Sequence, residues 1–458
     1  MTRIPAFALL AGAFFGALVS LQPIGDSDLF WHVEAGRRTL AGALPRADVF
    51  SWTVAGAPVF TDQWLGDVIL AAARTIGDWR GVLALRVVAV AVLVAVIVAT
   101  AMAARPGRPI VAVAAALPAI ALSRFAWTDR PELLGLVCFA ILVPLLRGGD
   151  RGLLVSIPLL AIWTQLHGSF AIGLALVLAT CAARGLTERR DRWRFVPIAS
   201  AAAVATLLGP SGVATWTSSG GHFLAPPRYI AEEGPPDTSS LAGVLFFVTL
   251  GLLLASALLS RRRATLEALA ILLPVAFVSL TAARHMPLLA IAAAPFLAER
   301  LPDPLATWRE RASRGGGARA TVSARSGHAV VAAASAAALA LAILIADGRV
   351  DETGYPRAAL AALPSGPGLL NRYEWGGWLM YAAPRTPVFI DGRLFPYVPG
   401  VLDDYRAILN AHPGWEAVAD RRGVRTMLVR PDDPIAGRAP DRGWRVAYRD
   451  DVALVLAR

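Results

Sequence analysis

Charged residues are scarce in this chain. They make up 17% of its 458 residues, whereas 56% are hydrophobic, and a soluble domain of this size carries about a quarter charged residues. The hydrophobic residues also form continuous runs of roughly 16 to 22 residues, the length that crosses the apolar core of a bilayer. The shortage of charge therefore excludes an ordinary soluble protein and predicts a polytopic α-helical membrane protein.

Cysteine is rare and nucleotide-binding motifs are missing. Cys138 and Cys181 both lie inside apolar runs, which argues against a disulfide framework or a thiolate metal site and indicates two small core residues. The sequence contains no glycine-rich phosphate loop and no Gly-x-Gly-x-x-Gly after a predicted strand. Lysine is absent, and the abundance of arginine and alanine indicates a GC-rich bacterial genome.

The apolar runs predict about eleven transmembrane helices. They lie at residues 4–22, 81–103, 109–123, 132–146, 152–166, 169–184, 195–209, 241–260, 265–282, 285–299 and 328–346. The net charge of +11 would suggest nucleic acid in a soluble protein. Here the arginines gather in every second loop, as the positive-inside rule requires, so we expect no nucleic-acid partner. This pattern predicts a bacterial inner-membrane protein with a cytoplasmic N-terminus and an extracytoplasmic C-terminus.

The predicted membrane domain, residues 1–346, includes three long connections. The first outer loop, 23–80, contains an amphipathic stretch at 64–76, which we expect to form a helix on the membrane surface. A second outer loop, 210–240, is rich in proline. The segment 300–327 is rich in Arg, Gly and Ser and is interpreted as a cytoplasmic linker.

Residues 347–458 have a different composition and predict a small α/β domain on the outer face. Buried strands are expected at 388–390, 426–429 and 452–456, alternating with helices at 374–382, 398–411 and 414–421.

Asp26, Asp28, His32 and Glu34 lie within nine residues, directly after the first apolar run. Ionisable clusters close to a membrane are costly and indicate function. Asp28 and His32 share one face of a helix, so a carboxylate there can take a proton from a hydroxyl acceptor. Alternatively, Asp26 and Asp28 hold a divalent cation such as Mg²⁺ or Mn²⁺, or one of them simply caps the helix.

Other polar residues are predicted at the outer ends of the spans. Asp62 either lines the same pocket or caps the 64–76 helix. Arg130, beside Glu132, stands at a helix N-terminus where the dipole disfavours a cation, which indicates an anionic partner or a lipid headgroup. His167 is either catalytic or structural.

Arg284 and His285 lie between two apolar runs on the predicted outer side. An arginine there departs from the positive-inside pattern, which favours a clamp for phosphate. The predicted topology puts this pair and the acidic motif on one side of the membrane. There a carboxylate can activate an acceptor while cations stabilise a departing phosphate. Nucleotide-activated donors are scarce outside the cytoplasm, so a lipid-linked donor fits better.

This layout resembles the GT-C superfamily of membrane glycosyltransferases, which use polyprenyl-phosphate or polyprenyl-diphosphate sugars. Residues 371–378, Asn-Arg-Tyr-Glu-Trp-Gly-Gly-Trp, and 387–393, Pro-Val-Phe-Ile-Asp-Gly-Arg, are similar to part of the oligosaccharyltransferase catalytic subunits. There a Trp-Trp-Asp-Tyr/Trp-Gly motif that recognises the acceptor's Ser/Thr precedes a strand ending in an acid. The patterns Asp-Leu-Phe-Trp-His, Leu-His-Gly and Trp-Gly-Gly also resemble those of a group of bacterial membrane proteins.

The sequence departs from the oligosaccharyltransferase pattern in two places. Tyr373 and Glu374 replace the first Trp and the Asp of the acceptor motif, so recognition of a peptide sequon does not follow from the resemblance. The family's later Ser-Val-Ser-Glu loop has only Glu232-Glu233 as a candidate counterpart.

The resemblance implies a role for each candidate. Asp28 would activate the acceptor or bind metal, with Asp26, His32 and Glu34 as further catalytic candidates, and Arg284, His285 and Arg130 would bind donor phosphate. The candidates for the acceptor side or the domain interface are Asp62, Glu132, His167, Glu374, Trp375, Asp391 and Arg393. For Trp375-Gly376-Gly377 the alternative is packing, because glycine permits close backbone approach.

The sequence therefore predicts transfer of a sugar or oligosaccharide from a polyprenyl-phosphate-linked donor to a lipid, glycan or protein acceptor outside the inner membrane. Two other classes stay open. A transporter or flippase of lipid-linked saccharides would carry polar residues near mid-span, and the runs here have almost none. A non-catalytic assembly protein would suit the looseness of the acidic motif.

Overall fold

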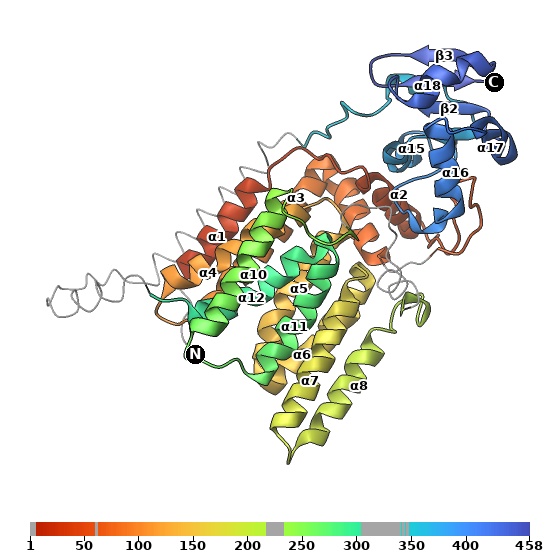
Figure 1. Cartoon of the computed structure of the whole chain (residues 1–458). Helices are drawn as coiled ribbons and strands as arrows, with labels where there is room; N and C mark the ends of the chain where they lie inside the picture. The colour runs from red at the N-terminus through yellow and green to blue at the C-terminus, as the bar shows by residue number, and fades with distance from the viewer. Residues whose placement is uncertain (1–5, 60–62, 217–232, 304–339, 341–343, 345–347) are drawn as a thin grey trace. The chain divides into compact units, whose positions relative to one another are not determined.

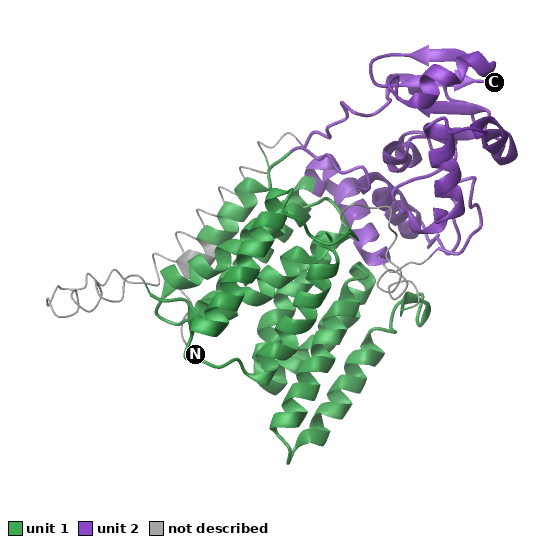
Figure 2. Cartoon of the chain, in the orientation of Figure 1, with its two compact units in different colours: residues 1–22, 83–347 green, residues 23–82, 348–458 purple. Residues whose placement is uncertain are grey.

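The computed structural model describes residues 6–59, 63–216, 233–303, 340, 344 and 348–458. The chain divides into two compact units (Figure 1, Figure 2). Unit 1 spans residues 1–22 and 83–347, and unit 2 spans residues 23–82 and 348–458. The first long loop therefore folds together with the C-terminal residues.

Unit 1 is a bundle of helices. Its described helices are α1 (Ala6–Val19), the second part of α3 (Trp64–Ala104), α4 (Pro109–Ser123), α5 (Pro131–Arg147), α6 (Gly149–Leu166), α7 (Phe170–Thr187), α8 (Phe195–Ala205), α10 (Leu241–Leu259), α11 (Leu266–Thr281) and α12 (Met286–Arg300). Helix α12 is buried along almost its whole length and packs against α4, α5, α10 and α11. It is therefore the central helix of this bundle.

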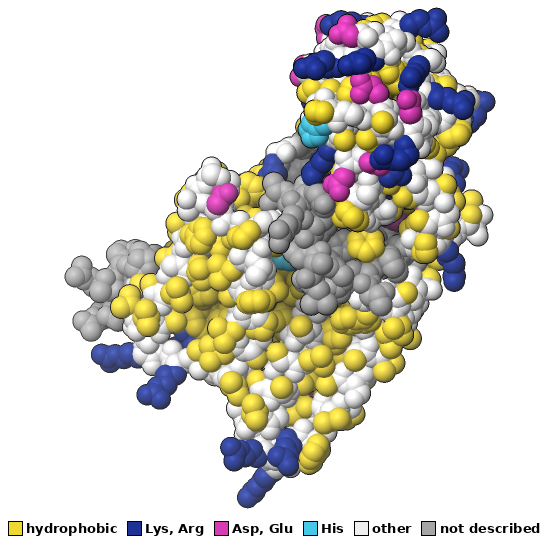
Figure 3. All heavy atoms as spheres, turned by 45° about the vertical axis from the view of Figure 1, so that its right-hand side comes forward, with side chains coloured by type: hydrophobic (Ala, Val, Ile, Leu, Met, Phe, Trp, Pro, Cys, Tyr) yellow, Lys and Arg dark blue, Asp and Glu magenta, His cyan; other side chains and the backbone are white. Residues whose placement is uncertain are grey.

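The surface of unit 1 is suited to lipid. Large apolar side chains are exposed on its outer helices, for example Phe277 (69% exposed) and Leu258 (84% exposed). Figure 3 shows hydrophobic side chains over much of one face of this unit. In water such a surface would be unfavourable, whereas hydrocarbon accepts it. This surface supports the predicted multi-pass membrane protein.

Each predicted span up to residue 299 corresponds to a helix. Four described stretches are long and apolar enough to cross a membrane: Trp64–Ala104, Pro109–Ala126, Phe170–Thr187 and Leu241–Leu259. The total of about eleven spans stays a prediction. The expected span 328–346 and the linker 300–327 lie almost entirely outside the described residues.

The arginine-rich loops of unit 1 meet at one end of the bundle. Their polar contacts join one loop to the next: Arg108 with Asp303, Arg147 with Glu299, Arg184 with Asp150 and Glu267, and Arg300 with the carbonyl oxygen of Arg263. These loops thus share one side, as the positive-inside pattern requires. The assignment of that side to the cytoplasm stays a prediction.

Helix α3 contains a break between its two predicted parts. Gly77 (φ −126°) and Asp78 (φ 55°) leave the helical conformation, so residues 64–76 and the apolar stretch after the break are separate helical segments, as predicted. The first segment packs closely on α2 (Leu29–Leu40). A Cβ on Gly36 would lie 2.0 Å from the carbonyl oxygen of Asp67, so only glycine permits this approach.

Unit 2 contains α2, the first part of α3 and the C-terminal elements. These are η5 (Ala358–Ala362), β1 (Leu369–Asn371), η6 (Tyr373–Trp375), α15 (Gly376–Ala382), η7 (Phe395–Tyr397), α16 (Gly400–Leu409), α17 (Trp415–Arg422), β2 (Thr426–Val429), α18 (Pro434–Arg438), η8 (Pro440–Arg442), β3 (Arg445–Arg449) and β4 (Leu454–Ala457). The strand order is β1-β2-β4-β3. Strand β1 is parallel to β2, with Leu370 opposite Met427, and the other two pairs are antiparallel.

The hydrophobic core of unit 2 combines both parts of the chain. Phe30 and Phe50 from the first loop share it with Trp375, Trp378 and Leu428 from the C-terminal part. The sequence predicted the small α/β domain, and β2, β4, α15, α16 and α17 lie close to their expected positions. The short β1 and the solvent-exposed β3 were not predicted, because neither is a run of buried residues.

The prediction that residues 388–390 form a strand of the sheet is wrong. These residues are buried, yet Val388 forms only an isolated bridge with Ser51. The side chain of Asn371 takes the place of a neighbouring strand: its amide donates to Ile390 O at 2.8 Å and its oxygen accepts from Phe389 N at 2.7 Å. Burial was therefore inferred correctly, but the hydrogen-bond partners were not.

Candidate functional site

The acidic motif begins α2 in unit 2. Just before it, Ile24 forms a parallel bridge with Val350. Oδ1 of Asp26 accepts a hydrogen bond from the backbone N–H of Asp28 at 3.0 Å. Asp28 occupies the N-cap position of α2, but its side chain makes no capping hydrogen bond. Helix capping therefore does not explain the half-buried carboxylate of Asp28.

Two glycines of the C-terminal part lie directly against this motif. A Cβ on Gly392 would lie 1.8 Å from Oδ1 of Asp28, and one on Gly377 would lie 2.7 Å from the carbonyl oxygen of Ser27. A real Cβ does not fit at these distances, so Gly377 cannot be replaced against the backbone of Ser27, whereas a Cβ at Gly392 would displace the Asp28 side chain. The Trp-Gly-Gly and Asp-Gly-Arg motifs thus lie against Ser27 and Asp28 of the Asp-Ser-Asp motif, although the three are far apart in the sequence.

Negative charge is concentrated around the acidic motif, close to Tyr355. Burial raises the pKa of Tyr355, and the carboxylates of Asp26, Asp28, Asp351 and Glu352 raise it further. Sequence reasoning did not single out Asp351 or Glu352. A surface with this charge attracts cations and hydrogen-bond donors such as sugar hydroxyls.

These carboxylates do not make a dedicated metal site. Among the described residues there is no group of three or more His, Cys, Asp or Glu side chains that could hold a metal ion. The predicted metal ligands, Asp26 and Asp28, provide two carboxylates, and one oxygen of Asp26 already accepts a backbone hydrogen bond. Magnesium prefers about six oxygen ligands in octahedral geometry, so this donor set alone does not fit the expected ion.

His32 is buried in a pair with Asp67 from α3. The distance from its Nδ1 to Oδ1 of Asp67 is 2.6 Å, and its ring stacks on Trp31 with the centroids 3.5 Å apart. His32 follows Asp28 by one helical turn, as predicted. Its side chain is only 3% exposed, so its evident role is to fix α2 against α3.

Glu34 is also engaged in ion pairs. It binds Arg37 at 2.7 Å and Arg38 at 3.0 Å. Burial raises the pKa of Glu34, but the hydrogen bonds from Arg37 and Arg38 outweigh burial and lower the pKa below its ordinary value. Glu34 is therefore held as a carboxylate on α2, which makes it a weak base.

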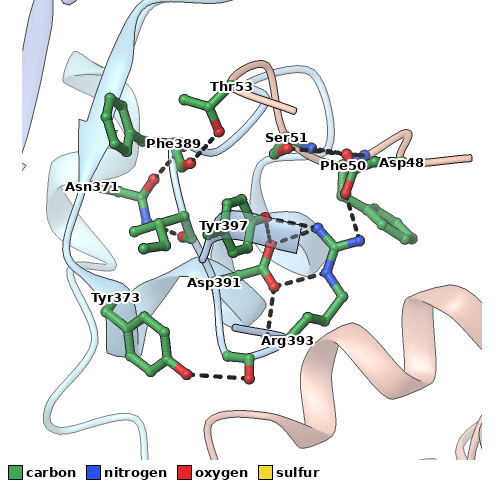
Figure 4. Close-up of polar contacts among 12 residues, drawn as sticks. Asp48, Phe50, Ser51, Thr53, Asn371, Tyr373, Phe389, Asp391, Arg393 and Tyr397 are labelled. Carbon is green, nitrogen blue, oxygen red and sulfur yellow. Dashed lines mark hydrogen bonds and ion pairs between the residues drawn. The ribbon is translucent and has the colours of Figure 1, made fainter. Parts of the chain in front are cut away.

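Arg393 joins two buried carboxylates in unit 2 (Figure 4). Its Nη1 lies 2.7 Å from Oδ2 of Asp48 in the first loop. Its Nε and Nη2 contact Asp391 at 2.8 and 2.6 Å. The hydroxyl of Tyr397 donates to Asp391 and accepts from Arg393 at 2.9 Å. The Asp48 and Asp391 side chains are 0% exposed and that of Arg393 is 9% exposed, so this is a buried ionic network.

This network holds Gly392 in place. Gly392 stands between two anchored residues, and its carbonyl oxygen accepts a hydrogen bond from the Tyr373 hydroxyl at 3.2 Å. On the first-loop side, Oδ1 of Asp48 accepts from the backbone N–H groups of Phe50 and Ser51 at 3.0 and 2.7 Å. These contacts join the first loop to the C-terminal part within unit 2, and the roles of Asp391 and Arg393 at the acceptor side or the domain interface stay predictions.

Glu374 and Trp375 have internal partners. Glu374 pairs with Arg372 at 2.7 Å and with Arg430 at 3.0 Å. Trp375 is 1% exposed, and its indole N–H donates to a backbone carbonyl at 2.9 Å. A Cβ on Gly376 would lie 2.3 Å from a carbonyl oxygen of the 390–391 segment. These contacts favour the packing interpretation of the Trp-Gly-Gly motif.

The predicted phosphate clamp lies in unit 1, in η4 (Ala283–His285). Arg284 Nη1 is 3.0 Å from Glu233 Oε1. His285 follows it at the last position of η4. Its Nδ1 lies 3.2 Å from Val278 O and donates there. The other ring nitrogen is then an acceptor, which makes Arg284 the better phosphate ligand of the two.

The remaining candidates of unit 1 stand at helix ends. Arg130 is at the N-cap position of α5, and Glu132 lies in its first turn, where the dipole favours an anion. His167 ends α6, and its Nδ1 accepts the backbone N–H of Ser169 at 3.2 Å, which supports a structural role. Asp62 lies outside the described residues.

Asp48 is the main residue that sequence reasoning missed. Its only local signal is the Asp-x-x-Ser pattern with Ser51, which is typical of a turn in which the acid binds backbone N–H groups. That pattern indicates a turn but not the distant Arg393. The pairing of Asp67 with His32 also left no local signal.

The fold has solved counterparts. No protein-family model matches this chain, and neither does any curated protein. The structure of the Archaeoglobus fulgidus oligosaccharyltransferase tethered to an acceptor peptide with the NVT sequon is similar at a TM-score of 0.58 and 14% identity. Its apo form gives 0.54 and 12%. The complex of the archaeal oligosaccharyltransferase AglB with an inhibitory peptide and a dolichol-phosphate gives 0.57 and 13%. Each match covers 93% of this chain and 69% of the other chain.

These matches confirm the predicted resemblance at the level of fold. The fold of the chain is similar to that of an archaeal oligosaccharyltransferase. At this identity the likeness does not carry over substrates or catalytic residues.

Proposed function

We propose that the chain is a glycosyltransferase that moves a sugar or oligosaccharide from a polyprenyl-phosphate-linked donor to an acceptor on the outer face of the inner membrane. The observation that carries the proposal is the setting of Asp28. Its carboxylate has no capping role, is half-buried, and lies where the three motifs meet in a fold shared with a glycosyltransferase.

The chemistry requires a base for the acceptor and a leaving group on the donor. The acceptor hydroxyl gives its proton to the Asp28 carboxylate while its oxygen attacks C1 of the donor sugar. The bond between C1 and the phosphate oxygen breaks, and the polyprenyl phosphate leaves with the electron pair. Because the acceptor attacks C1 once, the anomeric configuration inverts. Asp28 then returns its proton to water.

The other residues support this step in different ways. The network of Asp48, Asp391 and Arg393 holds the backbone against Asp28, and Arg284 is the proposed ligand for donor phosphate. The archaeal counterpart was solved with a dolichol-phosphate, which is consistent with a lipid-linked donor here. Glu374, through its ion pairs, and Trp375, through its packing, are the proposed supports of the acceptor side.

Sugar transfer by the purified full-length protein tests this function. The protein is placed in liposomes that contain a radiolabelled polyprenyl-linked saccharide pool from the native membrane together with an extract of native acceptors. We expect label to leave the lipid for an acceptor only when the protein is present, with inverted configuration at C1. Movement of the labelled lipid between leaflets without loss of its sugar would instead identify a flippase. Neither activity would favour the assembly role.

Gly392→Ala is expected to reduce sugar transfer about ten-fold or more without unfolding the protein. The new methyl group would meet Oδ1 of Asp28, which is the end of a side chain that can rotate away, so the carboxylate moves and loses its catalytic position. Transfer rate and melting temperature are measured together. Gly437→Ala is the matched control, because a Cβ there meets no atom within 4 Å. Full activity of Gly392→Ala would show that the approach to Asp28 is unimportant.

A further inference from the structure

Glu233 and Arg284 come from two separate segments of unit 1 and meet after the end of α11. The distance from Glu233 Oε1 to Arg284 Nη1 is 3.0 Å, and the two side chains are 7% and 28% exposed. A second contact supports the pair: the backbone N–H of Ala283 donates to Gly234 O at 2.8 Å. The carboxylate is therefore held at the guanidinium by a defined backbone connection as well as by charge.

The chemistry of Arg284 suits a phosphate equally well. A guanidinium offers five N–H donors in a planar fork and binds carboxylate and phosphate with the same geometry. The phosphodiester of a sugar-linked prenyl phosphate carries one negative charge, as the carboxylate does, and the free prenyl phosphate left after transfer is a monoester with about two at neutral pH. A lipid phosphate that reaches Arg284 can thus replace the Glu233 carboxylate.

We propose that Glu233 is an internal competitor that occupies the phosphate position of Arg284 until the lipid-linked donor displaces it. This inference rests on the proposed function and names the ligand of Arg284 as a prenyl phosphate group. Donor binding releases the Glu233 carboxylate and breaks its side-chain contact with Arg284 in η4, while the backbone contact between Gly234 and Ala283 remains. The acid sets the affinity for donor, because only the fraction of molecules with a vacated Arg284 can bind.

The test measures binding of farnesyl phosphate to the purified full-length protein in phosphatidylcholine nanodiscs. Glu233→Gln is expected to bind about three- to ten-fold more tightly than the wild type, the range for loss of one partly buried ion pair. Its backbone connection through Gly234 is unchanged. Arg284→Gln is expected to bind at least about ten-fold more weakly, because the cation is lost.

Glu267→Gln is the matched control. Glu267 lies at the opposite end of α11 and also faces an arginine, Arg184, at 3.6 Å, so the same substitution is made away from η4. Its affinity should equal that of the wild type, and all variants should melt at similar temperatures. Equal or weaker binding by Glu233→Gln overturns the proposal.

Two further ligands separate the sources of phosphate. Inorganic phosphate tests the bare anion, and nanodiscs with phosphatidylglycerol test a membrane headgroup. If Glu233→Gln strengthens binding of the headgroup but not of farnesyl phosphate, the assignment to the donor is wrong.

Sugar transfer in the same preparations separates the two proposals. A protein that shows the expected binding series but transfers no sugar refutes the transferase and leaves the role of Glu233 in place. A protein that transfers sugar, while Glu233→Gln binds farnesyl phosphate no more tightly, refutes only the competitor.

Discussion

Asp28→Asn is expected to lower the rate of sugar transfer by at least about 100-fold, the contribution typical of a general base. Asparagine has the same size and retains an oxygen that accepts hydrogen bonds, but its amide cannot take the proton of an acceptor. The carboxylate makes no capping hydrogen bond, so the start of α2 does not depend on its charge. The measurement is transfer from the labelled polyprenyl-linked pool at equal amounts of folded protein.

Substitutions of two other acidic residues serve as comparisons for Asp28→Asn. Asp26→Asn should lose less than about ten-fold, because an amide oxygen can still accept the backbone N–H of Asp28. Asp403→Asn, at an exposed position of α16, should be fully active. Wild-type transfer by Asp28→Asn, with a loss in Asp26→Asn, would move the base to Asp26. Unchanged transfer in both would remove the acidic motif from the reaction.

Arg393→Met is expected to lower the free energy of unfolding of unit 2 by about 3–5 kcal/mol, the cost of removing one partner from a buried ion pair. Methionine fills much of the space but leaves the carboxylates of Asp48 and Asp391 buried without their shared cation. Two uncompensated charges in a low-dielectric interior are strongly unfavourable. Thermal unfolding in detergent measures the loss, and hydrogen exchange at residues 48–53 should show whether the first loop detaches.

One further variant at position 393 and one at position 445 separate the effect of losing the positive charge from the effect of changing the size of the side chain. Arg393→Lys keeps a positive charge but lacks the planar fork that contacts both acids, so we expect an intermediate loss. Arg445→Met removes an exposed arginine on β3 and should change the unfolding free energy by less than about 0.5 kcal/mol. If Arg393→Met unfolds like the wild type, the network is not what holds the first loop to the C-terminal part.

Asp48 and the 388–390 segment illustrate what could not be read from the sequence. The backbone of Phe389 is held by the Thr53 hydroxyl, 336 residues away, and by the side chain of Asn371. Strand prediction uses local hydrophobicity, which correctly indicates burial but is blind to such partners. The same limit applies to Asp48, whose partner Arg393 lies at the other end of the chain.

The sequence by itself determined the membrane class, the helix positions, the alternation of arginine-rich loops and the presence of a C-terminal α/β region, because hydropathy and charge act residue by residue within each segment. Only the tertiary structure decided that the first loop and the C-terminal residues form one unit, that Gly392 lies against Asp28, and that His32 pairs with the buried Asp67. These features depend on contacts between segments that are far apart in the sequence. The residue pattern of one segment does not indicate which distant segment it will contact.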